Sequence, residues 1–172
     1  MVRDAPSEAR LGTGAWDRAS LARVLGALSR SGAAAIGVDL PLDRPSAPGR
    51  GGAASDALLG EAAALAGNVV FPVVLDPDGD GTGTSSTPMH RSWARPTSSE
   101  RSWLAARATT GALPGFAERA RAVGHLLAPG ESDGVVRRVP LLVRVGDRLV
   151  PAFGLAVAMA YANVGPDRKS VV

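Results

Sequence analysis

Residues 55–75 read SDALLGEAAALAGNVVFPVVL, and this stretch decides the fold. Its first part places leucine and alanine at helical spacing, and Ser55 and Asp56 can cap the start of that helix. Gly67 suits the end of the helix, and the apolar run at 69–75 predicts a buried strand. The stretch therefore predicts a helix that leads directly into a strand of a covered sheet.

The residues before this stretch show the same order. Asp17 is the expected N-cap of a helix that runs to about Arg30 with one apolar face. Residues 33–40 then predict a short buried strand that ends at Pro41. Two successive helix–strand units favour a parallel pair of strands with helices packed on the sheet.

The C-terminal part has a different pattern. Residues 135–145 alternate between apolar and polar side chains, which is typical of an edge or antiparallel strand. Gly146 and Asp147 form a two-residue turn signal, so residues 148–150 should return as a hairpin. The expected fold is α/β: a sheet with parallel N-terminal strands and an antiparallel C-terminal hairpin, and helices packed on its faces.

The middle of the chain is harder to interpret. Residues 76–99 are dominated by Asp, Gly, Ser, Thr and Pro, which predicts a flexible insertion. We expect one domain over residues 1–164 and a polar tail at 165–172. The remaining expected elements are helices at about 100–109, 114–123 and 152–163 and a strand at 124–127.

Composition excludes several classes of protein. The 172 residues contain 19 basic and 16 acidic side chains, so a net charge of +3 does not indicate a nucleic-acid partner. The absence of cysteine excludes disulfides and cysteine metal clusters. The sequence has no signal-peptide pattern and no apolar run long enough to span a bilayer, so membrane anchors are expected outside this segment.

Asp39 and Asp76 are candidate ligand-binding residues. Each stands at the carboxyl end of an expected parallel strand, and open α/β sheets bind their ligands at that edge. The alternative is that both residues only end a strand or cap the following turn.

Three acidic residues also suggest a metal. Asp76, Asp78 and Asp80 alternate as in the first half of a calcium loop, with Gly81 at the sixth position. The twelfth position is Thr87 instead of the bidentate Glu, so affinity would be weak. The alternatives are a weak calcium site and a flexible acidic loop, and no other cofactor is expected.

Trp93 and Arg137 complete the candidate ligand-binding set. Trp93 lies in the first of two Arg-Ser-Trp repeats, which could bind an anionic ligand, lipid headgroups or a partner surface, or could cover apolar sheet surface. Arg137 is the one charge on the apolar side of its expected strand. A bulge after Gly134 would turn it outward; otherwise it needs a partner such as Asp39 or a bound anion.

The sequence offers little for catalysis. His90 and His125 are the only histidines, and no nucleophile motif or nucleotide-binding motif accompanies them. We interpret His125, which lies in an apolar run, as a structural side chain. A hydrolase would need Ser, His and Asp brought together by the fold.

Three segments resemble the CHASE2 family. They are ARVLGALSRSGAAAIGVDLPLDRPS at 22–46, DALLGEAAALAGNVVFPVVL at 56–75 and FAERARAVGHLLAPGESDGVVRRVPLLVRVGDRLVPAFGLAVAMA at 116–160. The last includes the Gly-His strand and the Asp-Gly-Val-x-Arg hairpin of that family. The chain departs from the family pattern at Leu42, where an aromatic residue is common, and in its long insertion.

The resemblance implies an extracytoplasmic sensory domain of a bacterial membrane receptor. In this family one transmembrane helix usually precedes the domain and several follow it. The cytoplasmic output is an adenylate or guanylate cyclase, a histidine kinase or a serine/threonine kinase. We therefore expect a non-enzymatic sensor of an unknown small ligand or stress, which could form a homodimer. The alternative is a constitutive dimerisation or protein-interaction domain without a small ligand.

Overall fold

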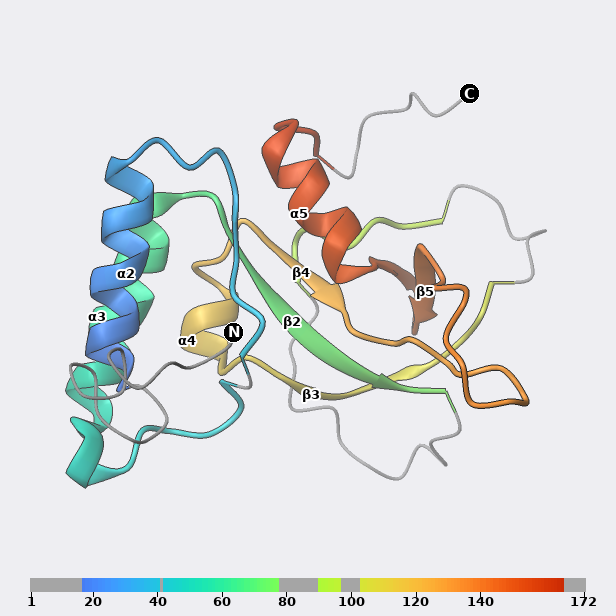
Figure 1. Cartoon of the computed structure of the whole chain (residues 1–172), viewed down its shortest axis with the longest axis horizontal. Coiled ribbons are helices and arrows are strands. Elements are labelled where there is room, and N and C mark those ends of the chain that lie inside the picture. The colour runs from blue at the N-terminus through green and yellow to red at the C-terminus, as the bar shows by residue number, and fades with distance from the viewer. Residues whose placement is uncertain (1–16, 41, 78–89, 97–102, 166–172) are drawn as a thin grey trace.

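The computed structural model describes residues 17–40, 42–77, 90–96 and 103–165 (Figure 1). Helices and strands alternate along the first part of the chain, and a hairpin and a last helix close it. In chain order the elements are α2 (Arg18–Arg30), β1 (Ile36–Gly37), the short 3-10 helix η1 (Pro48–Arg50), α3 (Gly52–Ala66), β2 (Val69–Asp76), β3 (Arg107–Gly111), α4 (Pro114–Ala117), β4 (Ala122–His125), β5 (Leu142–Val145), β6 (Arg148–Pro151) and α5 (Phe153–Tyr161).

Strand β2 is the centre of the main sheet. It pairs in parallel with β1 at Val69 and Val70, and in parallel with β4 over residues 70–73. Its last residues, 73–76, pair with β3 in the antiparallel sense. Val70 of β2 pairs with both β1 and β4, and Val73 pairs with both β3 and β4, so in each case the two partners lie on opposite edges of β2. Strand β4 therefore occupies one edge of β2, and β1 and β3 follow each other along the opposite edge.

The hairpin forms a second, two-stranded sheet. Strands β5 and β6 are antiparallel, and Gly146 takes a left-handed φ of 59° in the turn between them. Single bridges join the hairpin to its surroundings: Ala94 to Leu149, Ala105 to Arg144, and His125 to Ala152. The last bridge places the hairpin beside the end of β4. The expected fold, a partly parallel sheet with an antiparallel C-terminal hairpin, is confirmed.

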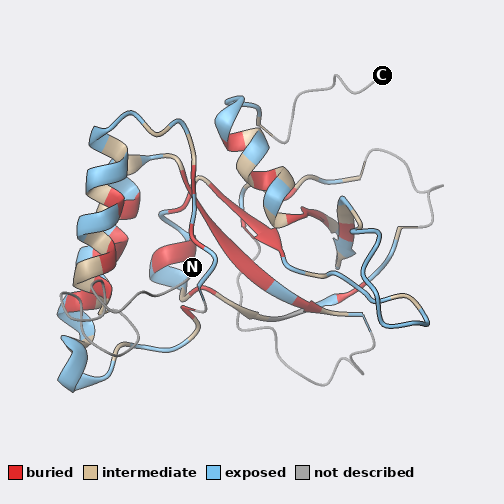
Figure 2. Ribbon diagram, viewed as in Figure 1, coloured by how far each residue is buried: buried red, intermediate tan, exposed pale blue. Residues whose placement is uncertain are grey.

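Helices pack on both faces of β2, and Figure 2 shows this strand as buried over most of its length. Val69 and Phe71 pack in one core cluster with residues of α2, α3 and α4. Val70 points to the other face, where it packs with Ala156 and Ala160 of α5. Neighbouring residues of a strand point to opposite faces, so the continuous apolar run is explained by a sheet covered on both sides.

Several local predictions are confirmed. The Asp17 carboxylate caps α2 by accepting a hydrogen bond of 2.7 Å from the Ser20 N–H. Gly67 ends α3 with a φ of 69°, a conformation that glycine adopts without steric cost. Helix α3, however, begins at Gly52 after Gly51, so Ser55 and Asp56 are not its caps.

Predictions in the second half were less accurate. The helix expected at 100–109 is wrong over its described part, because residues 103–106 are not helical and β3 begins at Arg107; residues 100–102 lie outside the described ranges. Helix α4 ends at Ala117, and the following strand starts at Ala122, two residues earlier than expected. The segment 135–140 is exposed and irregular, so the expected strand at 135–145 is reduced to β5. These segments take their structure from partners distant in the sequence, which local patterns do not contain.

Candidate binding groove

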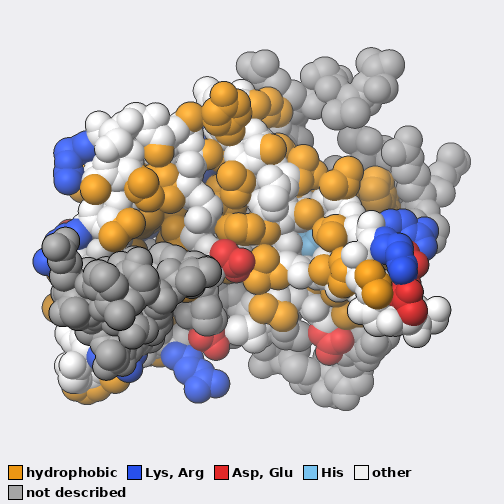
Figure 3. Space-filling view, viewed as in Figure 1, with side chains coloured by type: hydrophobic (Ala, Val, Ile, Leu, Met, Phe, Trp, Pro, Cys, Tyr) orange, Lys and Arg blue, Asp and Glu red, His pale blue; other side chains and the backbone are white. Residues whose placement is uncertain are grey.

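A groove lies between α2, β1 and the loop that follows β1, and its volume is about 780 Å³. One wall is the apolar face of α2, on which Val24 and Leu28 are 40% and 42% exposed. Leu40 lines the opposite side and is 41% exposed. Figure 3 shows hydrophobic side chains gathered on the surface over and beside α2. A hollow with this much exposed apolar surface is a candidate site for a small ligand.

Asp39 stands in the groove, two residues after β1. Its side chain is exposed, and it forms no hydrogen bond or ion pair with the described residues. Asp43 also lines the groove but has a partner, since the Arg44 Nε lies 3.7 Å from its carboxylate. Among the described residues, Asp39 is thus a carboxylate without a direct partner beside an apolar surface.

A buried ion pair supports one end of the groove. The Arg18 Nη1 lies 2.5 Å from the Asp56 Oδ1, which connects the first turn of α2 to α3. The same guanidinium donates to the Arg44 carbonyl, and the Asp56 carboxylate accepts a 3.1 Å hydrogen bond from the Ser46 N–H. The loop that forms the groove wall is thereby tied to both helices.

Arg18 was not among the residues that the sequence singled out. A cation in the first turn of a helix is unfavourable to the helix dipole, so its position there was a signal that it pairs with a distant carboxylate. Ser55, expected to cap α3, accepts a 2.9 Å hydrogen bond from the Ala19 N–H of α2 instead. Both residues of the expected cap therefore join α2 to α3.

Asp76 does not line the groove. When the parallel register of β1 and β2 is extended past the end of β1, Asp39 lies level with Pro72 of β2. Asp76 lies four residues further along β2. That separation corresponds to about 13 Å along a strand. Asp76 pairs in register with Arg107 of β3, so the structure separates the two expected ligand-binding aspartates.

Trp93 is 1% exposed and packs against β2, β4 and the hairpin strands. Its Nε1 donates a 3.0 Å hydrogen bond to the Val123 carbonyl. This position agrees with the alternative that Trp93 covers apolar sheet surface. Trp93 does not line the groove. A ligand-binding role for Trp93 stays a prediction.

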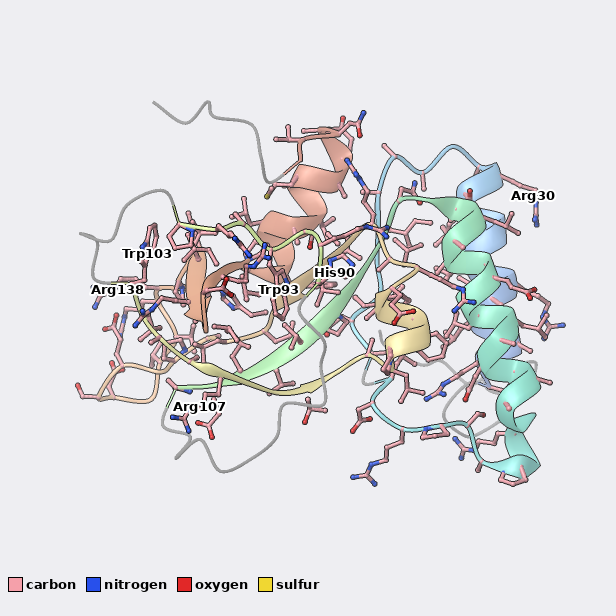
Figure 4. The ribbon with its side chains drawn as sticks, turned by 180° about the vertical axis from the view of Figure 1, so that it is seen from behind. Arg30, His90, Trp93, Trp103, Arg107 and Arg138 are labelled. Atoms are coloured by element: carbon pink, nitrogen blue, oxygen red, sulfur yellow. The ribbon has the colours of Figure 1, made fainter. Side chains whose placement is uncertain are left out.

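Arg137 is exposed and forms ion pairs with Glu131 at 3.2 Å and Asp133 at 2.8 Å. The hydrogen bonds between them raise the pKa of Arg137 and lower the pKa of Asp133. The outward orientation is thus the one the structure adopts, and Asp39 is not its partner. Figure 4 shows the neighbouring Arg138 at the end of the molecule opposite α2.

The calcium hypothesis falls mostly outside the described ranges. Asp78 and Asp80 are not described, and Asp76 is half-buried. Within the described part of the chain, no group of three acidic or histidine side chains could hold a metal ion. The weak calcium site at Asp76, Asp78 and Asp80 stays a prediction.

His90 and Ser92 lie within hydrogen-bond distance, 2.7 Å between Nδ1 and Oγ. The His90 Nδ1 also accepts the Ser92 N–H, and the Ser92 Oγ accepts the Val123 N–H. Burial and the nearby Arg91 lower the pKa of His90 to about 4. Figure 4 shows His90 beside Trp93 in the interior. None of the described carboxylates pairs with the His90 ring, so the acid that would orient the histidine of a catalytic triad is absent from the described residues. We interpret the contact between His90 and Ser92 as part of a structural turn.

His125 is also structural in its contacts. It is 1% exposed, and its Nδ1 accepts a 3.2 Å hydrogen bond from the Leu127 N–H. Burial lowers its pKa. The ring lies in the interior at the end of β4, as expected from the apolar run around it.

Comparison with known families identifies the chain. A family model described as the CHASE2 domain matches residues 3–170, almost the whole length. Curated proteins give no match, and solved structures give none. Each helix within the described ranges is too short or too polar to span a bilayer. The chain belongs to the CHASE2 family of extracytoplasmic sensory domains, a family defined by sensing and not by catalysis.

Proposed function

We propose that this domain senses a small ligand on the outer side of a bacterial membrane and regulates a cytoplasmic enzyme in the same polypeptide. The output would be an adenylate or guanylate cyclase, a histidine kinase or a serine/threonine kinase. The groove beside Asp39 is the observation that supports a small ligand. Its exposed leucines, and a carboxylate without a partner among the described residues, favour an apolar molecule that carries a positive charge.

Binding would act by population shift. A ligand that contacts both α2 and the loop after β1 stabilises the conformation in which the two are held together. The Arg18–Asp56 pair already connects these elements, so a change in the groove reaches the start of α2 and α3. Flanking transmembrane helices, which the family resemblance leads us to expect, would carry the change across the membrane.

Two probes of opposite charge test the groove. We expect decylammonium to bind this domain more tightly than decanoate, and to shift the NMR signals of Leu28 and Leu40. Asp39→Asn should reduce decylammonium affinity roughly three- to tenfold, since the carboxylate is exposed and screened. The matched control is Asp147→Asn, an exposed carboxylate outside the groove. Equal binding of both probes, or an equal loss in the control, contradicts this site.

The membrane context has its own test. A topology reporter fused to this segment in the full-length protein should report the outer side of the membrane. A cytoplasmic signal would contradict the sensory proposal, whatever the groove binds. Asp39→Asn in that protein should reduce the change in output that decylammonium causes.

One observation favours a second function, constitutive dimerisation. Leu58 and Leu65 on α3 are 50% and 88% exposed, and their spacing of seven places them on one face of the helix. Sedimentation of the domain distinguishes the two functions. A concentration-independent dimer that Leu65→Glu converts to a monomer favours assembly, whereas a monomer that binds decylammonium favours sensing.

A further inference from the structure

A second, smaller hollow lies where α5 ends against the start of β4. Its volume is about 200 Å³, and Arg91 and Arg121 both line it. Part of its wall is apolar and is formed by Pro151, Met159 and Val164. The residues around it come from three segments that are distant in sequence, 91–92, 121–122 and 151–165, so the hollow is a product of the tertiary fold.

The two guanidinium groups are held by neutral acceptors. Arg91 donates to the carbonyls of Glu118 at 3.2 Å and Ala120 at 2.9 Å. Arg121 donates to the Asn163 Oδ1 at 2.9 Å. Carbonyl and amide oxygens orient a guanidinium but do not neutralise it. The described residues that line the hollow include no carboxylate, so this part of the lining holds two oriented guanidinium groups and no counter-charge.

We propose that this hollow binds a small anion, a carboxylate or a phosphate group, between Arg91 and Arg121. Guanidinium groups bind both anions through paired N–H donors, and the apolar wall accommodates a short carbon chain next to the charge. Arg91 is fixed by two carbonyls before any ligand arrives, which reduces the entropy lost on binding.

The site is connected to the end of α5. Asn163 is the only described non-glycine residue with a positive φ, 52°, and it turns the chain just after the helix. Arg121 contacts its side chain, and Val164 and Gly165 form part of the wall. An anion that draws Arg121 inward competes with the Asn163 contact, so occupancy changes how the chain leaves the domain.

Titration with inorganic phosphate, followed by NMR at constant ionic strength, tests the site. We expect saturable shifts at Ala122 and Asn163. Arg121→Gln, whose single contact is exposed, should weaken phosphate binding at least about tenfold. Arg119→Gln is the matched control. Arg119 lies two residues before Arg121 in sequence, donates to the Gly115 carbonyl and lies outside the hollow.

The source of the anion is decided by a parallel experiment with vesicles. Retention on phosphatidylglycerol vesicles but not on phosphatidylcholine vesicles, lost in Arg121→Gln, supports a lipid phosphate as the ligand. Saturable binding of free phosphate without vesicle retention supports a soluble anion. Shifts that do not saturate, or that Arg119→Gln weakens equally, overturn the site. Neither result depends on the groove beside Asp39, so the two proposals fail independently.

Discussion

The Arg18 guanidinium and the Asp56 carboxylate form an ion pair of 2.5 Å that joins α2 to α3. Both side chains are largely buried, with 11% and 18% of their surface exposed. The guanidinium also lies 5.2 Å from the centre of the Phe116 ring, so it contacts α4 as well. One arginine therefore connects three helices and, through the Arg44 carbonyl, the wall of the groove.

Breaking this pair should destabilise the domain strongly. Arg18→Met leaves Asp56 with a mostly buried charge, and among the described residues the Ser46 N–H is its remaining hydrogen-bond donor. We expect the free energy of unfolding to fall by about 3 kcal/mol, measured by urea denaturation. Arg138→Gln is the control, because that arginine is 87% exposed and its ion pair should contribute less than about 1 kcal/mol. Similar losses in both variants would contradict the role assigned to Arg18.

Acid should destabilise the domain through His90. The pKa of His90 is about 4 in the folded protein and ordinarily 6.5, so the unfolded chain binds the proton more readily between these values. The neutral ring's contribution is complete above the unfolded pKa and is lost as the pH falls toward 4. It amounts to about 3 kcal/mol.

His90→Gln should remove this part of the pH dependence. The test compares urea unfolding of both proteins at neutral pH and near pH 4. Carboxylates and His125 contribute to both proteins alike, so the difference between them isolates His90. Parallel pH profiles would show that His90 is not the responsible group.

The contact between β4 and α5 depends on Gly124. A Cβ there would lie 2.7 Å from the Phe153 Cα and 2.9 Å from the Ala156 Cβ, so the helix would have to move away from the sheet. We expect Gly124→Ala to lower the thermal midpoint by several degrees, a loss of about 2 kcal/mol. Gly154→Ala, in the same helix with open space around it, should instead stabilise the protein by up to about 1 kcal/mol. Loss of stability in both would contradict the close packing.

Trp93 should be a main support of the hairpin. Trp93→Ala removes a fully buried ring from the cluster between β2 and the hairpin and should cost about 4 kcal/mol. Trp93→Phe keeps most of the ring and should cost less, chiefly through the lost hydrogen bond to the Val123 carbonyl. Near-native stability of the alanine variant, measured by urea denaturation, would exclude this role.

Elements with a strong local signal were predicted well. Asp17 and the apolar stripe of α2, Gly67 after α3, the apolar run of β2 and the turn at Gly146 all depend on residues close in sequence. Strand β3 could not be predicted in this way. It forms because β1 covers only Val69 and Val70, which leaves the remaining edge of β2 free for another strand.

The candidate site residues show the same difference between local sequence signals and long-range contacts. Asp39 was placed correctly at the end of a parallel strand, and it lines the groove. Asp76 carried an equal signal but lies further along the sheet. Strand β1 pairs with β2 only at Val69 and Val70, and β2 runs on to Asp76 beyond that pairing. Arg18, Arg91 and Arg121 had no motif to mark them, since their partners are backbone or side-chain groups distant in sequence.

The amino-acid sequence by itself determined the family, the order of helices and strands at the two ends of the chain, and the position of Asp39 after a strand. Short-range periodicity and capping are sufficient for the order of elements and for the position of Asp39, whereas the family follows from the resemblance of three long segments and the match over residues 3–170. Only the tertiary structure decided which charges meet, which stay uncompensated and where the surface is hollow. Burial and pairing depend on distances between residues far apart in the chain, and those distances exist only after folding.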